Sequence, residues 1–293
     1  MIRPKLKFAG MLLLLAAPCF VGAAELLPPE SDPAVVIDHY IDAKLQAAGV
    51  TPAPLADDSA LLRRTLLDLE GRTPTATEAQ AYLANKEPNK RTSLVDAALA
   101  SPRFVRHQVD EFDVMLSGLG KSNLKQYLKL AMTENRPWDQ IFRELLLAEE
   151  ATPAQAGAKQ FLKTRLSDLD RLANETSVIF FGVNISCAKC HDHPLVKSWT
   201  QEHFYGMASF FNRTFEHGDF LGERGYGRVD YQTTSGENRT AKLMFLTGTY
   251  VEEPEAAEPK DAEKKAEKEL LEKLKKEKQA PPSPSFSRRA KLV

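Results

Sequence analysis

Several common marks of fold and function are missing from this sequence. Lys and Arg number 39 against 40 Asp and Glu, so the basic stripe of a nucleic-acid-binding surface is not expected. Between residues 33 and 213 no stretch alternates with the two-residue period of a strand. We find no internal repeat, no Ser-His-Asp arrangement, no Gly-rich phosphate loop and no isolated carboxylate pair. A stand-alone enzyme is therefore less expected than a binding or electron-transfer domain.

Cysteine is also scarce, and one of the three cysteines lies in an N-terminal segment that is expected to be removed. Three basic residues precede an apolar run over residues 9–21, which is too short to cross a bilayer, and small residues follow until Ala24. This pattern predicts a signal peptide over residues 1–24 and export to the periplasm or the medium. Cys19 would be removed with it, leaving only Cys187 and Cys190. The mature chain would have 36 basic and 40 acidic residues, a net charge of about −4, and no further apolar run able to span a membrane.

The fold class predicted is mostly α, a multi-helix domain over residues 25–215. Helix caps, helical spacing of leucines and a Thr-x-x-Glu capping box from Thr75 to Glu78 support it. The expected helices lie near residues 32–49, 57–71, 73–85, 90–100, 103–117, 122–134, 137–150, 166–181 and 198–211.

The glycine-rich segment 216–251 predicts a small β-hairpin. Its expected strands are "RVDYQTT" (228–234) and "AKLMFLTGTY" (241–250), joined by "SGENRT".

Residues 252–293 are predicted to form a charged tail. A Glu/Lys/Ala tract, helical or disordered, leads into a Pro/Ser linker, and we expect both to be solvated and to contribute nothing to the core. A linker so close to the end suggests truncation before a further domain.

The sequence Cys187-Ala188-Lys189-Cys190-His191 is the C-x-x-C-H pattern of covalent haem attachment. The two thiols can form thioethers with the two porphyrin vinyl groups, and His191 can bind the iron as proximal ligand. Such attachment takes place after export, so the signal peptide and the motif agree. The apolar helix before the motif and the apolar face of the helix after it could wall a haem or serve an ordinary core.

Three alternatives stay open for the same residues. Cys187, Cys190, His191 and His193 could bind zinc, although structural zinc sites draw ligand pairs from separated segments. A redox disulfide is possible in principle, but such motifs belong on a βαβ scaffold. A structural disulfide would close a very short loop and would leave His191 without a role.

The segment "CAKCHDHPLVKSWTQEHFYGMASFF" resembles the signature of a family of secreted planctomycete proteins named as cytochrome-c-like. The resemblance extends over roughly residues 57–213, through "LLRRTLLDLEGRTPTATEAQAYLA", "LVDAALASPRFVRHQVDEF" and "RPWDQIFRELLLA". Members commonly continue into a second planctomycete-specific domain, which implies a C-terminal companion domain that is absent here. Gln108 stands where a Trp is usual.

The remaining histidines supply candidates for the second axial position. His107 matches the family pattern and is the preferred distal ligand. His203 and Met207, one helical turn apart, are the other options, whereas His193 lies too near His191 and is expected to anchor the loop. His39 and His217 are expected in surface or loop positions.

Together these features predict an exported mono-haem c-type domain that transfers electrons to an unknown partner protein. The alternative is a scaffold domain with a structural zinc or disulfide at Cys187 and Cys190. A third hypothesis is an accessory domain of an exported hydrolase.

Overall fold

The computed structural model describes residues 26–117, 124–150, 152–255 and 257–293, and it divides at Asp57 into two units. The predicted signal peptide lies outside the described residues. The first unit contains helix α1 (Pro33–Ala47), which begins as expected because Asp32 accepts a hydrogen bond from the Ala34 amide (2.8 Å) and Pro33 occupies the first turn. No residue of α1 is buried.

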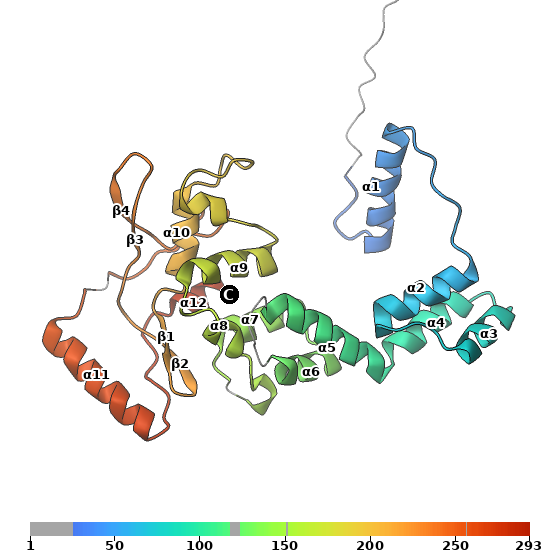
Figure 1. Cartoon of the computed structure of the whole chain (residues 1–293). Helices are drawn as coiled ribbons and strands as arrows, with labels where there is room; N and C mark the ends of the chain where they lie inside the picture. Colours follow the sequence, from blue (N-terminus) through green and yellow to red (C-terminus); the bar gives the residue numbers. More distant parts are fainter. Residues whose placement is uncertain (1–25, 118–123, 151, 256) are drawn as a thin grey trace, which may run out of the picture. The chain divides into compact units, whose positions relative to one another are not determined.

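The second unit, residues 58–293, is mostly helical, as predicted (Figure 1). Most of its helices begin and end within a few residues of the expected positions, because most termini coincide with Pro, Gly or cap residues in the sequence. The short helices at Gln160–Lys163 and Arg288–Leu292 were not expected. The α-helices are α2 (Asp58–Glu70), α3 (Ala76–Ala84), α4 (Lys90–Leu99), α5 (Pro102–Ser117), α6 (Lys125–Thr133), α7 (Trp138–Leu147), α8 (Gln160–Lys163), α9 (Leu169–Phe181), α10 (Gln201–Ser209), α11 (Asp261–Lys276) and α12 (Arg288–Leu292). Two 3₁₀ turns are η1 (Pro153–Gln155) and η2 (Ser186–Lys189).

Helices α2, α3 and α4 share a small hydrophobic cluster of their own, built on Leu62, Leu66 and Tyr82. The capping box predicted at the start of α3 is confirmed, with the Glu78 carboxylate accepting from the Thr75 amide (2.8 Å). Arg72 donates two hydrogen bonds to the same carboxylate and, with the Thr75 amide, lowers the pKa of Glu78 to about 2.

The main core gathers helices α5 to α10. Its centre includes Phe161, Phe204 and Leu145, all shielded from solvent. Arg165 lies inside it with no exposed surface, donating to Glu175 (2.6 Å) and to the Leu116 carbonyl (2.7 Å). A buried guanidinium is tolerated only when its donors are satisfied, so Arg165 ties α5, α8 and α9 to one arrangement.

Two short antiparallel hairpins follow α10, where one was expected. Strands β1 (Thr214–His217) and β2 (Phe220–Glu223) turn at Gly218-Asp219 and form a hairpin that was not expected. Strands β3 (Asp230–Gln232) and β4 (Asn238–Thr240) form the second.

The second expected strand, residues 241–250, is not a strand in the structure. Leu243 and Met244 are neighbours and both are buried, which breaks the alternation that a half-buried strand needs. Only a single bridge joins Met244 to Tyr250.

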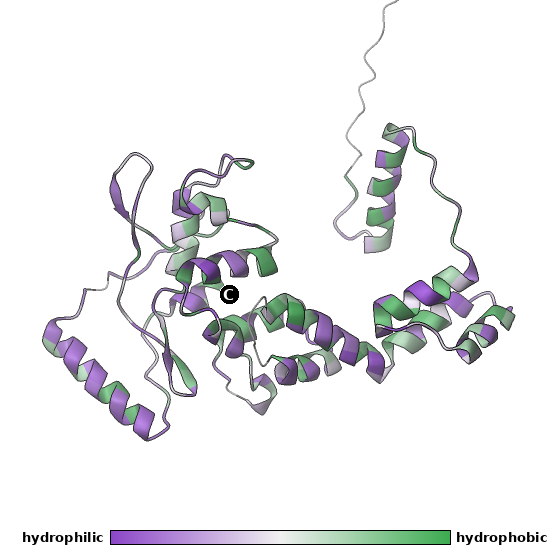
Figure 2. Ribbon diagram, in the orientation of Figure 1, coloured by the Kyte–Doolittle hydropathy of each residue, from purple (hydrophilic) through white to green (hydrophobic). Residues whose placement is uncertain are grey.

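The tail separates into an exposed helix and a docked one. Helix α11 buries no residue and is hydrophilic on most of its surface, as expected (Figure 2). The expectation that nothing in the tail joins the core is wrong for α12, which contacts α7 and buries Arg288, Arg289 and Leu292. Charged residues are rarely buried unless paired, so composition did not mark this segment as part of the core.

Candidate functional site

The C-x-x-C-H residues occupy a single tight turn between α9 and α10. Turn η2 carries Cys187, and Cys190 caps its end with its amide bonded to the Cys187 carbonyl (3.3 Å). Ala188 points inward and is fully buried, whereas both cysteines are exposed and free. The turn therefore presents two unpaired thiols to the surrounding solvent.

The turn is fastened from both flanking helices. The Lys189 ammonium pairs with Asp170 near the start of α9, and the Lys189 carbonyl accepts from Gln201 at the start of α10 (3.1 Å). Asn174 of α9 accepts from the Ile185 amide just before the turn (3.0 Å). Three anchors of this kind fix the backbone of the turn without using either thiol or the imidazole of the motif.

His191 is held in one tautomer. Its Nδ1 lies 2.7 Å from the Asp192 carbonyl oxygen, which can only accept, so Nδ1 carries the proton. Nε2 then keeps its lone pair, and His191 is exposed. A ring N–H donated to a backbone carbonyl is the usual arrangement of a histidine that binds a metal through its other nitrogen.

His193 is held in the opposite tautomer. Its Nδ1 accepts from the amides of Leu195 (3.3 Å) and Val196 (3.1 Å), so the proton of a neutral ring is on Nε2. Its own amide donates to the Trp199 carbonyl (2.8 Å), and the two rings meet edge to face. His193 is thus a loop anchor, as predicted.

His203 and Met207 are both engaged in α10. The His203 Nδ1 accepts from the Thr200 amide (3.2 Å) and caps the helix, and burial lowers the pKa of His203. Met207 has 1% exposure and belongs to the main core. The Nδ1 atom of His203 is therefore used in helix capping, and the Met207 side chain is used in core packing.

His107, the preferred distal ligand, packs elsewhere along the chain. It is half-buried on α5, and its ring lies against Gly71 after the end of α2. A β-carbon built on Gly71 would stand 2.6 Å from His107 Nδ1. In the part of the chain described, no hydrogen bond or ring contact joins His107 to the C-x-x-C-H turn, so its distal role stays a prediction.

A glycine substitution tests that placement. Gly71 has φ +68°, as does Gly182, but a β-carbon at Gly182 meets nothing within 4 Å. Both alanine variants should lose about 1–3 kcal/mol of unfolding free energy to backbone strain, and Gly71→Ala should lose more because it clashes with His107. Denaturant unfolding of Gly71→Ala/His107→Ala should show that the excess is recovered. An excess that persists in the double variant would contradict the packing of His107 on Gly71.

The other two histidines belong to α1 and β1. His39 is on α1 in the first unit, with its ring edge to face with Tyr40. His217 was expected at the surface but is 5% exposed in β1, and its Nε2 has no hydrogen-bond partner among the described residues. The error arose because the glycine-rich segment that begins at Gly218 suggested an open loop.

Among the described residues, no group of three or more His, Cys, Asp and Glu side chains is placed to hold a metal ion. Within the same residues, no helix is both long and apolar enough to cross a bilayer.

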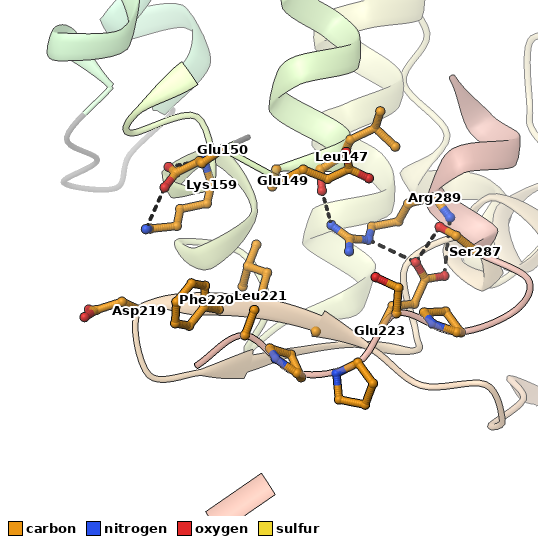
Figure 3. A pocket seen from close by; sticks show the side chains of 17 residues that line it. Leu147, Glu149, Glu150, Lys159, Asp219, Phe220, Leu221, Glu223, Ser287 and Arg289 are labelled. Atoms are coloured by element: carbon orange, nitrogen blue, oxygen red, sulfur yellow. Dashed lines mark hydrogen bonds and ion pairs between the residues drawn. The ribbon is translucent and has the colours of Figure 1, made fainter. Parts of the chain in front are cut away.

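A cavity lies where α12 docks, far along the sequence from the motif. This cavity of about 480 Å³ is bordered by the end of α7, by β2 and by the Pro/Ser segment. Figure 3 shows Arg289 between the Leu147 carbonyl (2.8 Å) and Glu223 (3.4 Å), both of which it contacts. Glu150 is tied to Lys159 (2.7 Å) on the opposite wall. Arg289 thus binds Glu223 and Lys159 binds Glu150, so these charges are paired with one another where the C-terminal segment borders the cavity.

The residues that hold the turn were not predicted from the sequence. Asp170, Asn174 and Gln201 lie 11 to 17 positions from the nearest motif cysteine, and ordinary helix-surface residues look the same in one sequence. The only signal for Gln201 was its position at the start of a helix directly after the motif.

The family model PSCyt2, described as a protein of unknown function (DUF1549), matches residues 36–216. The match therefore contains the C-x-x-C-H turn and ends inside β1. No curated protein and no solved structure matches the chain.

Proposed function

The chain belongs to the PSCyt2 family of proteins of unknown function, and we propose that it is an exported mono-haem c-type cytochrome-like domain that transfers electrons. Export is supported by the basic and apolar pattern of residues 1–24. The haem proposal is supported by the donor set and by the way the turn presents it.

Cys187 and Cys190 would hold the haem covalently. Each thiol would add across one vinyl group, the sulfur bonding one carbon and its proton passing to the other. His191 Nε2 would bind the iron, with Nδ1–H donated to the Asp192 carbonyl. A haem bound in this way supplies one-electron transfer, with a potential set by the axial ligands and by burial.

One observation carries the proposal: the two neighbouring histidines have opposite tautomers. His191 is exposed and its Nε2 is available, whereas His193 Nδ1 accepts hydrogen bonds from two loop amides. A zinc site made from this segment needs both histidines as ligands together with both cysteines. The hydrogen bonds favour one histidine ligand, which is what a proximal haem ligand requires.

The test is to express the chain with its own N-terminus in a host that matures c-type cytochromes. We expect a pyridine haemochrome spectrum from covalent haem, at one haem per chain. The Cys187→Ser/Cys190→Ser variant is the matched control and should contain none. A purified protein that holds stoichiometric zinc and no covalent haem would overturn the proposal in favour of a scaffold domain.

A further inference from the structure

Helix α10, which contacts the C-x-x-C-H turn, carries an aromatic residue, Tyr205, that the motif does not predict. Tyr205 lies one helical turn after Gln201 on α10, so both residues belong to the face that meets the turn. Gln201 is the residue that hydrogen-bonds the Lys189 carbonyl (3.1 Å). The ring of Tyr205 stacks on Tyr231 of β3, with centroids 4.2 Å apart and planes 15° from parallel.

The β3–β4 hairpin is connected to the same turn by hydrogen bonds. Gln201 is 8% exposed, and its amide nitrogen also lies within reach of the Gln232 carbonyl (3.4 Å). Its amide oxygen accepts from the Thr234 backbone (3.0 Å). One buried side chain therefore links the C-x-x-C-H turn to a hairpin that lies beyond the family match, which ends at residue 216.

The electrostatics of Tyr205 agree with this placement. Burial raises the pKa of the Tyr205 phenol, Lys189 opposes the rise, and the charges of Asp170 and Cys190 add to it. The pKa of Tyr205 therefore responds to charges of the turn and of α9. The Tyr205 hydroxyl has no hydrogen-bond partner among the described residues, although the residue is half-buried.

We propose that Tyr205, held by its stack on Tyr231, forms the aromatic wall beside Cys190 and limits solvent access to a group carried there. The β3–β4 hairpin is then part of the site. Tyr205 is a positioning residue in this role. The identity of that group, a planar conjugated macrocycle, rests on the proposed function. The wall itself does not.

The first measurement is made on the haem-loaded full chain. Tyr205→Leu removes the ring and should lower the midpoint potential and shift the Soret band, because added water stabilises the more highly charged ferric state. Tyr205→Phe keeps the ring and should remain close to the parent. Tyr226→Phe is the control, since that tyrosine bonds Glu267 of α11, and it should change neither quantity. Unchanged potential and spectrum in a folded, loaded Tyr205→Leu protein would overturn the wall.

The second measurement needs no haem and separates the two proposals. In chain produced without haem maturation, alkylation rates of Cys190 and Cys187 are compared by mass spectrometry. Tyr205→Leu should speed the alkylation of Cys190 relative to Cys187. Tyr231→Leu should have a smaller effect in the same direction and serves as the test if Tyr205→Leu fails to fold. An unaltered ratio would refute the wall. If the parent chain never binds haem and Tyr205→Leu still alters the ratio, only the haem proposal is refuted.

Discussion

Arg289→Ala is expected to lower the free energy of unfolding by about 3–5 kcal/mol, because it leaves a buried carboxylate without its cation. Arg289 and Glu223 pair at 3.4 Å, and the Glu223 side chain retains only 2% exposure. For a chain of this size such a loss lowers the melting temperature on the order of 10 °C. Thermal and denaturant unfolding of the two proteins measure it.

The large effect comes from a network of buried charge pairs. Arg288 makes two hydrogen bonds to Glu253 (2.9 and 2.6 Å), which also pairs with Arg213 at 2.6 Å. Arg289 also donates to the carbonyl of Leu147, at the end of α7 (2.8 Å). Removing residues 287–293 would strip both arginines at once, so that deletion should exceed the single substitution.

The matched control is the exposed helix between these anchors. Replacing residues 261–276 by a flexible linker of equal length should change the melting temperature by much less than Arg289→Ala, because α11 buries no residue. A neutral Arg289→Ala would show that the docked tail is not part of the folded core. An α11 replacement as harmful as Arg289→Ala would show instead that α11 is not merely solvated.

The helices could be predicted because their signals are local. Asp32 with Pro33, the Thr75–Glu78 box and the glycines that follow several helices define ends through contacts of one to four residues. The first hairpin was equally local, since Gly218-Asp219 is a favourable two-residue turn, and its signal was overlooked.

The docked tail could not be predicted, because its partners are distant in sequence. Glu223 lies 66 residues before Arg289, and nothing near the arginines marks it. The site shows the same division. Cys187, Cys190 and His191 form a local motif. Gln201, in contrast, donates to the Lys189 carbonyl 12 residues before it and to the Gln232 carbonyl 31 residues after it.

His191→Ala is expected to abolish haem maturation or to alter the Soret band and shift the midpoint potential strongly, because it removes the proposed proximal ligand. His193→Ala should leave the spectrum near that of the parent. That substitution removes the acceptor of the Leu195 and Val196 amides and so loosens the loop, which should appear as lost stability. Absorption spectra, redox titration and thermal unfolding of both variants separate the two roles.

The pair of variants also discriminates among the alternatives for the turn. In a zinc site each histidine would be one of four ligands, so both substitutions should release metal about equally. With a disulfide between Cys187 and Cys190 neither histidine would affect the cofactor or the redox properties, and only the stability loss at His193 would remain. The opposite tautomers place the chemical effect on His191 and the structural effect on His193. Equal and severe loss of cofactor in both variants would therefore refute the proximal-ligand assignment.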